Sequence, residues 1–377
     1  MRFKEFNKPF PILVNEGARI QHAEDLVFFE GGAGARRALE GLKKLEQDGH
    51  NDVTIKWDGS PAIIFGRNAQ GEFILTDKGG FIAKGYDGRP KTGEDLSKML
   101  IARMKGKAVT PDRQEFAEKM GDLFNVFEKA FDKSYEGFFK GDLLYYTTPQ
   151  QENGSFVFKP QIVTYKVSVD SKIGQQIAKS TAGVVVHRRV DQDGTEHPLK
   201  DIPPLNASVL AVPPMTAQAP VDIDDSSIKQ LEQLINKQAV NLDRFLDPAM
   251  LKSQKMTDLG TILYTYTNSK VDTGLGDLGK DFMRWLVKSK VTAVKQERIK
   301  NHILSNQESY SALWQIVNGI MAVKDDIIRQ LDQQESPVKQ YIGSASGGEG
   351  YVLASPNGDI KLVPRAYFSK ANRAVRR

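Results

Sequence analysis

The sequence predicts an α+β protein in which antiparallel sheets with helices are interrupted by an all-α segment. β-rich runs separated by turn residues recur up to residue 190, helical periodicity prevails from Ser226 to about Glu335, and β signals return from Gly350. The chain has 377 residues, of which 40% are hydrophobic and 26% charged, a composition that can bury a sizeable core. One large domain or two modest domains are therefore expected.

Composition also excludes several kinds of site. Cys is absent, which removes disulfides, thiolate catalysis and Cys-ligated metals, and the 5 His residues lack the spacing of zinc motifs. The sequence has no run of about 18 uncharged apolar residues, and its first residues lack the apolar core of a signal peptide. We therefore expect no membrane partner and a cytoplasmic location.

The first elements in order are a short strand, a glycine-rich turn and a helix. Residues 26–30 are an apolar run, Gly-Gly-Ala-Gly follows at 31–34, and apolar residues then recur at helical spacing through Leu45. The glycines resemble a dinucleotide-binding loop, but Arg37 stands where the third glycine of that motif belongs. A glycine-rich turn before a capped helix is the preferred interpretation.

Two hairpins and a helix are expected next. Residues 113–131 form a predicted helix, because Phe116, Met120, Leu123 and Phe127 recur on one helical face. The predicted hairpins pair 53–57 with 62–66 through a turn at 58–61, and 73–76 with 80–83. Further β-rich stretches cover 138–146, 155–167 and 182–190.

A Pro-rich connector at 203–221 precedes the helical segment. Near the C-terminus, residues 350–354 and 359–363 flank a Pro-Asn-Gly turn at 356–358, which predicts another hairpin. The simplest organisation is one domain made of residues 1–220 and 338–377, interrupted by a helical insertion domain at 221–337.

Positive charge is concentrated in one stretch of the helical segment. Residues 280–300 hold seven cations and two acids, a net charge of +5 that equals the net charge of the whole chain. This density suits a polyanion such as nucleic acid, and a solvated helix face is the alternative. Trp285 and Trp314 are expected to pack in the core. The candidate nucleic-acid-binding residues are Lys280, Arg284, Lys288, Lys290, Lys295 and Arg298.

The stretch Thr54-Ile55-Lys56-Trp57-Asp58-Gly59 carries the most informative chemistry. Lys56 ends an apolar strand, where partial burial disfavours a charged amine and favours a nucleophilic one. Asp58 is two residues further on, so in an extended chain it points to the same side and can orient the amine or bind a metal. The alternative is an ordinary Asp-Gly turn beside a surface lysine.

Five motifs in order resemble those of the covalent nucleotidyltransferases, the superfamily of ATP-dependent DNA ligases, RNA ligases and capping enzymes. The resemblance covers most of residues 20–190 and 345–373, and the phrases KWDGSPA, IKLVPRAYFSKAN and HAEDLVFF are similar to phage-encoded members in particular. The motifs are Lys56-Trp57-Asp58-Gly59, Thr76-Asp77-Lys78-Gly79-Gly80, Phe139-Lys140-Gly141-Asp142-Leu143-Leu144-Tyr145, Gly348-Glu349-Gly350-Tyr351-Val352 and Ile360-Lys361-Leu362-Val363.

The resemblance implies a ligase adenylation domain and an ATP-dependent polynucleotide ligase, which joins 5′-phosphate to 3′-OH ends through a covalent lysyl-AMP intermediate. Lys56 would attack the α-phosphate of ATP, Lys361 would hold that phosphate, and Glu349 and Asp142 would hold Mg²⁺ or Mn²⁺. We expect RNA or DNA ends as partners, a monomeric protein and, for a phage-encoded chain, the host cytoplasm. The implied nucleotide-binding residues are Ile55, Asp58, Gly59, Lys78, Asp142, Phe158 and Lys361.

The sequence departs from the family pattern at three points. Pro61 replaces an expected arginine, Val363 replaces the second lysine of the fifth motif, and 207 residues separate Asp142 from Glu349. The helical segment accounts for that excess if its ends lie close together. The chain ends about 15 residues after the fifth motif, so no C-terminal OB domain is expected, and we favour RNA or single-stranded substrates.

Three alternatives stay open beside this interpretation. They are a DNA ligase that seals nicks, a guanylyltransferase of the capping type, and a non-catalytic nucleic-acid-binding protein on the same fold. Pro61 and Val363 motivate the last of these. A Rossmann-type oxidoreductase is a more distant alternative.

Overall fold

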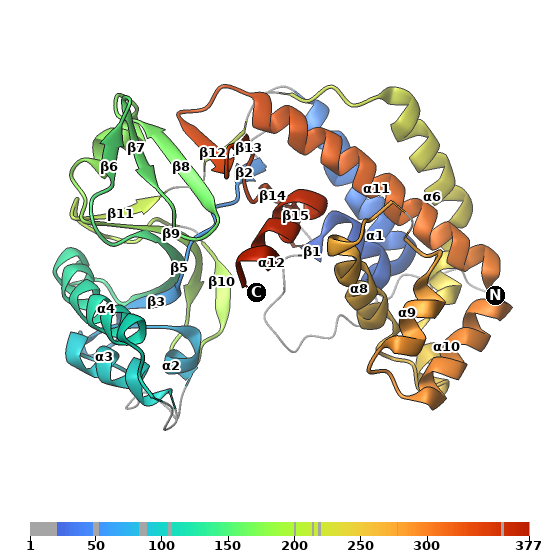
Figure 1. The fold of residues 1–377 in the computed structure, drawn as a ribbon, viewed down its shortest axis with the longest axis horizontal. Coiled ribbons are helices and arrows are strands. Elements are labelled where there is room, and N and C mark those ends of the chain that lie inside the picture. The colour runs from blue at the N-terminus through green and yellow to red at the C-terminus, as the bar shows by residue number, and fades with distance from the viewer. Residues whose placement is uncertain are drawn as a thin grey trace. The chain divides into compact units, whose positions relative to one another are not determined.

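The structure, a computed structural model, describes residues 21–47, 53–82, 89–104, 108–199, 201–212, 215–217, 220–276, 278–355 and 358–376. It has the expected α+β class, with helices and mostly antiparallel sheets. The chain forms two compact units (Figure 1). We call residues 1–56, 216–334 and 349–377 the helical unit, and residues 57–215 and 335–348 the sheet unit.

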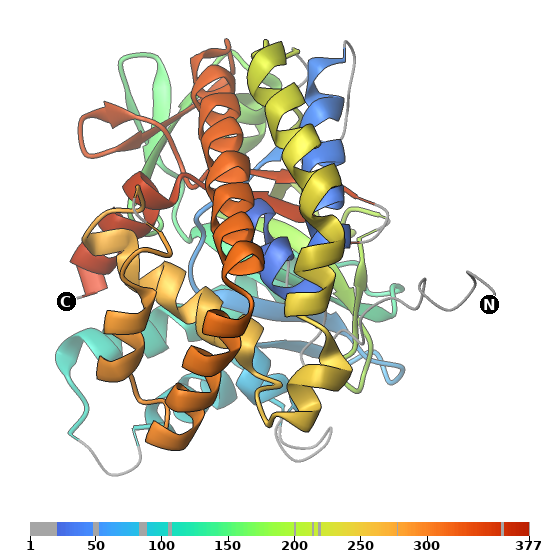
Figure 2. The same cartoon turned by 90° about the vertical axis from the view of Figure 1, so that its right-hand side faces the viewer.

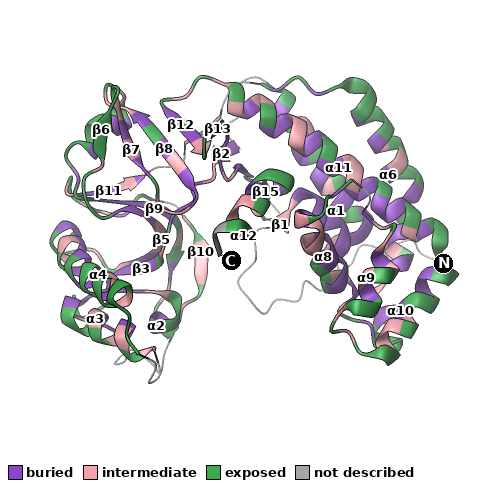
Figure 3. Ribbon diagram, in the orientation of Figure 1, coloured by how far each residue is buried: buried purple, intermediate pink, exposed green. Residues whose placement is uncertain are grey.

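Three long helices build the core of the helical unit. They are α1 (Leu26–Lys43), α6 (Asp225–Phe245) and α11 (Gln307–Gln333), which lie side by side (Figure 2). Most of α1 is buried, whereas α6 and α10 carry many exposed residues (Figure 3). The smaller helices are α7 (Pro248–Ser253), α8 (Leu259–Ser269), α9 (Phe282–Lys288), α10 (Ala293–Ser305) and α12 (Lys370–Arg376).

A four-stranded sheet, which we call the motif sheet, completes this unit. Its strand order is β1-β15-β14-β2. Strand β15 pairs parallel with β1 and antiparallel with β14, and β14 pairs antiparallel with β2. The strands are β1 (Gln21–His22), β2 (Val53–Ile55), β14 (Tyr351–Leu353) and β15 (Ile360–Leu362).

The sheet unit contains two further sheets. The larger has the order β10-β9-β5-β3-β4, with β11 paired to β9, and helices α3 (Gly93–Ala102) and α4 (Pro111–Ala130) share its apolar core. Its strands are β3 (Ala62–Arg67), β4 (Phe73–Thr76), β5 (Gly137–Tyr145), β9 (Ala182–Val190), β10 (Glu196–Pro198) and β11 (Val209–Val212). The second sheet has the order β13-β12-β8-β7-β6, and its strands are β6 (Gln150–Glu152), β7 (Ser155–Phe158), β8 (Val163–Ser168), β12 (Val338–Ile342) and β13 (Ala345–Ser346).

Several predicted elements are confirmed. Helix α4 and strands β5, β7, β8 and β9 lie where the sequence places them, and residues 225–333 are helical over most of their length. Strands β14 and β15 form the expected antiparallel pair. Of the turn predicted at 356–358, residues 356 and 357 lie outside the described residues.

Three local predictions are wrong. Residues 26–30 are not a strand but the start of α1, because five apolar residues carry no readable period and here continue into a buried helix. Residues 80–82 belong to helix α2 (Lys78–Ile82) rather than a strand. Strand β2 does not pair with β3. Instead β2 pairs with β14, and β3 pairs with β4 and β5. Residues 58–61 therefore connect strands of two different sheets and do not form a hairpin turn.

The glycine-rich stretch bends α1 and packs on α6. Gly31 has φ 59° and ψ −136°, a left-handed conformation that interrupts the helix. The backbone N–H of Gly32 donates to Oδ1 of Asp243 at 2.7 Å. This stretch therefore contributes to helix packing; it lies inside α1 rather than in a turn before a capped helix.

The units divide the chain differently from the predicted domains. The helical segment does not stand apart as an insertion, because its apolar residues share one core with α1 and with strands β14 and β15. A helix with one apolar face must bury it, and α1 and α11 supply that partner surface for α6. None of the helices in the described part of the chain combines the length and apolar character needed to cross a bilayer.

Candidate functional site

One row of side chains crosses the motif sheet. Thr54 is paired with Val352, Val352 with Lys361, and Lys361 with His22. These four residues are partly buried, whereas the neighbouring strand positions, such as Leu353, are buried in the helical core. The sheet thus has one face against the helices and a second face on which this row lies.

Lys56 continues that second face. Its backbone N–H donates to the carbonyl of Gly350 at 2.9 Å, so the ladder of β2 and β14 extends one residue beyond Ile55. Because side chains alternate along a strand, Lys56 lies on the same face as Thr54 and therefore on the face of Lys361.

The amine of Lys56 contacts a carboxylate. Its Nζ lies 2.5 Å from Oε1 of Glu349, and the two side chains are 21% and 15% exposed. The next residue, Gly350, has φ 108°, and a Cβ at this position would lie 2.1 Å from the carbonyl oxygen of Leu362, so glycine is required where this chain passes the end of β15. The fold therefore joins the first, fourth and fifth motifs on one sheet.

A cluster of buried charges lies in the same unit, on η1 (Ala23–Asp25), α11 and the segment after β15. Nζ of Lys324 binds both carboxylate oxygens of Glu24, at 2.9 and 3.0 Å, and both side chains are fully buried. Arg365 pairs with Asp25 and with Glu24. We call Glu24, Asp25, Lys324 and Arg365 the buried charge cluster.

Burial and charge shift the titration of this region. Burial opposes ionisation of Glu24, but Lys324 and Arg365 lower the pKa of that carboxyl. Burial raises the pKa of Asp25 to about 7, with Arg365 opposing the rise. Burial lowers the pKa of His22 well below its usual range, and the charges of Arg365, Lys324, Lys361 and Lys56 lower it further. The sequence analysis missed this cluster, although the acidic pair in HAEDLVFF, directly before an apolar run, was a readable signal.

In the sheet unit, the carboxylate of Asp58 accepts hydrogen bonds from the backbone. Its side chain is buried, and Oδ2 accepts from the backbone N–H groups of Ile162 at 3.1 Å and Val163 at 3.4 Å. The hydroxyl of Tyr165 accepts from the backbone N–H of Asp58 at 2.6 Å. Asp58 therefore anchors the segment after Lys56 to strand β8.

Phe158 stands in an aromatic cluster. Its ring stacks on Tyr165 at 5.4 Å and on Trp57 at 6.4 Å, and Tyr145 meets its edge at 5.3 Å. The side chain is buried, which is the packing expected of a core phenylalanine. Its predicted contact with adenine stays a prediction.

Asp142 lies on β5, paired in register with Ala62. Its Oδ2 lies 3.0 Å from Nε2 of His187, and a Cβ at Gly59 would come within 2.6 Å of its own Cβ, so Gly59 is the residue that fits beside it. Lys78 begins α2, half exposed, with Nζ 3.6 Å from Glu196. The candidate residues thus divide into Ile55, Lys56, Glu349 and Lys361 in the helical unit and Asp58, Gly59, Lys78, Asp142 and Phe158 in the sheet unit.

Comparison with known families adds one finding. The model of one family matches residues 18–377. The chain belongs to DUF6267, a family of unknown function. A search of curated proteins and a search of solved structures gave no significant match.

The predicted metal ligands of the DUF6267 chain are the carboxylates of Glu349 and Asp142. Within the described residues, no group of three or more His, Asp or Glu side chains gathers to hold an ion. Mg²⁺ commonly binds one or two carboxylates and completes its shell with water and phosphate oxygens. Glu349 in the helical unit and Asp142 in the sheet unit each carry one carboxylate of this kind, and their predicted role as metal ligands stays a prediction.

The predicted nucleic-acid-binding cations lie on and around α9 and α10. Arg284, Lys288 and Lys290 are exposed and form no ion pair within the described part of the chain. Nζ of Lys295 lies 2.9 Å from Oδ2 of Asp258, so the charge of this lysine is already balanced by a carboxylate. Lys280 is exposed and Arg298 is partly buried. Trp314 is buried and Trp285 packs against the same core, as expected.

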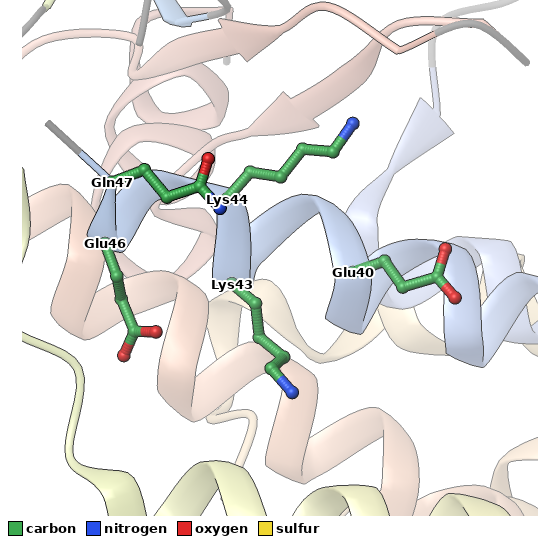
Figure 4. Close-up of a pocket in the computed structure, with 5 residues that line it drawn as sticks. All are labelled: Glu40, Lys43, Lys44, Glu46 and Gln47. Carbon is green, nitrogen blue, oxygen red and sulfur yellow. The ribbon is translucent and has the colours of Figure 1, made fainter. Parts of the chain in front are cut away.

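In the described part of the helical unit, two hollows are lined by residues outside the five motifs. One of about 450 Å³ lies at the end of α1, where Glu40, Lys43 and Lys44 point in different directions (Figure 4). The other, of about 380 Å³, is polar and contains no carboxylate; it is lined by Ser253, Gln254, Lys255, Arg298, Asn301, His302, Ser305 and Asn306. Neither hollow is lined by Lys56, Glu349 or Lys361, so neither is a candidate binding site for the nucleotide.

Proposed function

We propose that this protein is an ATP-dependent polynucleotide ligase of the covalent nucleotidyltransferase type. The observation that supports it most is the contact of Lys56 with Glu349, two residues 293 positions apart in the chain, on the sheet face that carries Lys361. The adenylation-domain fold is part of this proposal. It would explain why motif residues far apart in sequence meet on one sheet.

The first step forms the lysyl adenylate. The lone pair of Lys56 Nζ attacks the α-phosphorus of ATP, a P–N bond forms, and the bond to the β-phosphate oxygen breaks as pyrophosphate leaves with the electron pair. The amine must first lose a proton, and the carboxylate of Glu349, 2.5 Å away, is placed to accept it. Lys361 would stabilise the negative charge that builds on the phosphate oxygens.

Two further transfers complete ligation. An oxygen of a 5′-phosphate attacks the phosphorus of the lysyl adenylate, and the P–N bond breaks to return Lys56 with its proton. A 3′-OH then attacks the activated 5′-phosphate, loses its proton and displaces AMP. Mg²⁺ or Mn²⁺, when bound, would neutralise phosphate charge, with Glu349 and Asp142 as the available carboxylate ligands.

The cations of α9 and α10 would hold the nucleic-acid backbone. Arg284, Lys288 and Lys290 are exposed, so they can neutralise phosphates without first breaking an ion pair within the described chain. Contacts of this kind position a strand and do not read its sequence. RNA or single strands are the first substrates to test, with nicked DNA as the alternative.

Incubation with ATP labelled at the α-phosphate and Mg²⁺ tests the proposal. Wild-type protein should acquire an acid-labile label, and Lys56→Ala should not. Lys270→Ala is a matched control, because Lys270 is also ion-paired and 19% exposed yet belongs to η4 (Lys270–Asp272). Labelled GTP in the same assay separates a guanylyltransferase from a ligase.

A non-catalytic nucleic-acid-binding protein is the second candidate. Two observations favour it: Val363, at the position of the second motif lysine, is buried, and the carboxylate of Asp58 is engaged by backbone amides. Salt-sensitive binding of nucleic acid without any covalent label would support this candidate over the ligase.

A further inference from the structure

His22 stands at the end of the row that crosses the motif sheet. It belongs to β1, and its Cα is the register partner of Lys361 on β15. It is therefore the first side chain beside Lys361 on that strand ladder, on the face that also carries Lys56. None of the five motifs includes it.

The imidazole of His22 makes no hydrogen bond within the described residues. Its Nδ1 is buried and has no partner, while the residue as a whole is only partly buried. A buried nitrogen without a partner loses its hydrogen bonds to water without replacement, so such atoms in a native protein call for an explanation.

The surroundings of the ring are rich in positive charge. Arg365, Lys324, Lys361 and Lys56 all act electrostatically on it. A neutral imidazole has one N–H and one lone pair, so each tautomer donates from only one nitrogen. With the N–H on Nε2, the ring can donate it to an anion while the lone pair stays on Nδ1.

We propose that His22 is a ligand-contacting residue that donates its Nε2–H to a phosphate oxygen of an anion bound on the face of Lys361 and Lys56. The ligand class is a polyphosphate, and under the proposed function, on which this identification rests, it is the triphosphate of ATP. His22 adds a neutral, directional donor to two cations, which fixes the orientation of a phosphate group that charge alone would leave free to rotate.

Binding of inorganic tripolyphosphate tests this without any chemistry on Lys56. In protein labelled with ¹⁵N-histidine, addition of tripolyphosphate should move the ring nitrogen signals of His22. In calorimetry, His22→Ala should raise Kd roughly tenfold or more, as expected for a lost hydrogen bond to a charged group. His22→Gln, which can still donate, should lose less. His197→Ala, at a histidine paired with Asp191 in the sheet unit, is the matched control and should bind like wild type.

The outcomes separate this inference from the proposed function. Unmoved His22 signals, no binding by wild type, or equal Kd values for wild type and His22→Ala would each overturn it. If wild type never forms a lysyl adenylate but binds tripolyphosphate, and His22→Ala loses that binding, the proposed anion contact of His22 stands and the proposed ligase function fails. If His22→Ala does not fold, the wild-type ring signals and His22→Gln decide the question.

Discussion

Replacing Lys324 should strongly destabilise the helical unit. The ammonium group is fully buried and binds both oxygens of Glu24, which is itself fully buried and shared with Arg365. Lys324→Met keeps most of the side-chain volume but leaves Glu24 and Asp25 with one cation between them. Removing one partner of a buried ion pair costs about 3–5 kcal/mol, so we expect a loss of this size in the free energy of unfolding.

Urea denaturation followed by tryptophan fluorescence measures this loss, since Trp314 is buried in the same core. The double variant Lys324→Met with Glu24→Gln should recover much of the stability, because it removes both charges. Lys229→Ala on α6, which breaks an exposed pair with Asp225, should leave the midpoint unchanged. A Lys324→Met midpoint equal to that of Lys229→Ala would refute the reasoning that this cluster is a buried, coupled group.

Three further predictions concern the same unit. The pKa of Asp25 is about 7 in the folded protein against a usual 3.8, so its protonated form stabilises the fold below pH 3.8, and this contribution is lost as the pH rises to about 7. Chemical denaturation across this pH range should show a fall in the free energy of unfolding for wild type and no such fall for Asp25→Asn. Glu349→Gln should reduce lysyl adenylate formation at least about a hundredfold in a rate assay with labelled ATP, because the amine loses its proton acceptor; a wild-type rate would contradict that role. Arg284→Glu with Lys288→Glu should weaken binding of a 5′-phosphorylated oligonucleotide and lower the salt slope by about two, measured by fluorescence anisotropy, whereas an unchanged slope would exclude α9 from the interface.

How much the sequence predicts can be judged from particular residues. The phenylalanines of 113–131 predict α4 because their spacing is long and regular, and the Pro-Asn-Gly stretch correctly predicts the pairing of β14 with β15. The pairing of β2 could not be predicted, because β14 lies almost 300 residues further along the chain and nothing in the local pattern of 53–57 selects it over the adjacent β3. The turn residues at 58–61 favoured pairing of β2 with the adjacent β3, whereas tertiary packing pairs β2 with the distant β14.

The candidate site was predictable in part. The motif resemblance placed Lys56, Glu349 and Lys361 in one group, and the structure brings them to one sheet face. Asp58 was expected to orient the amine or bind a metal, which stays a prediction; the hydrogen bonds of its carboxylate to the amides of Ile162 and Val163 depend on tertiary structure and could not be predicted from spacing. His22 could not be found from spacing, because its significance depends on a parallel register with Lys361 that only the fold provides.

The central claim is that the amine of Lys56 becomes covalently bonded to a nucleotide. Peptide mapping by mass spectrometry, after incubation with ATP and Mg²⁺ or Mn²⁺, tests it most directly. The account predicts AMP on the peptide that contains Lys56, and a strongly reduced yield in Lys361→Ala. A nucleotide attached to a different lysine, or unmodified peptide after incubation with both ATP and GTP, would contradict the account.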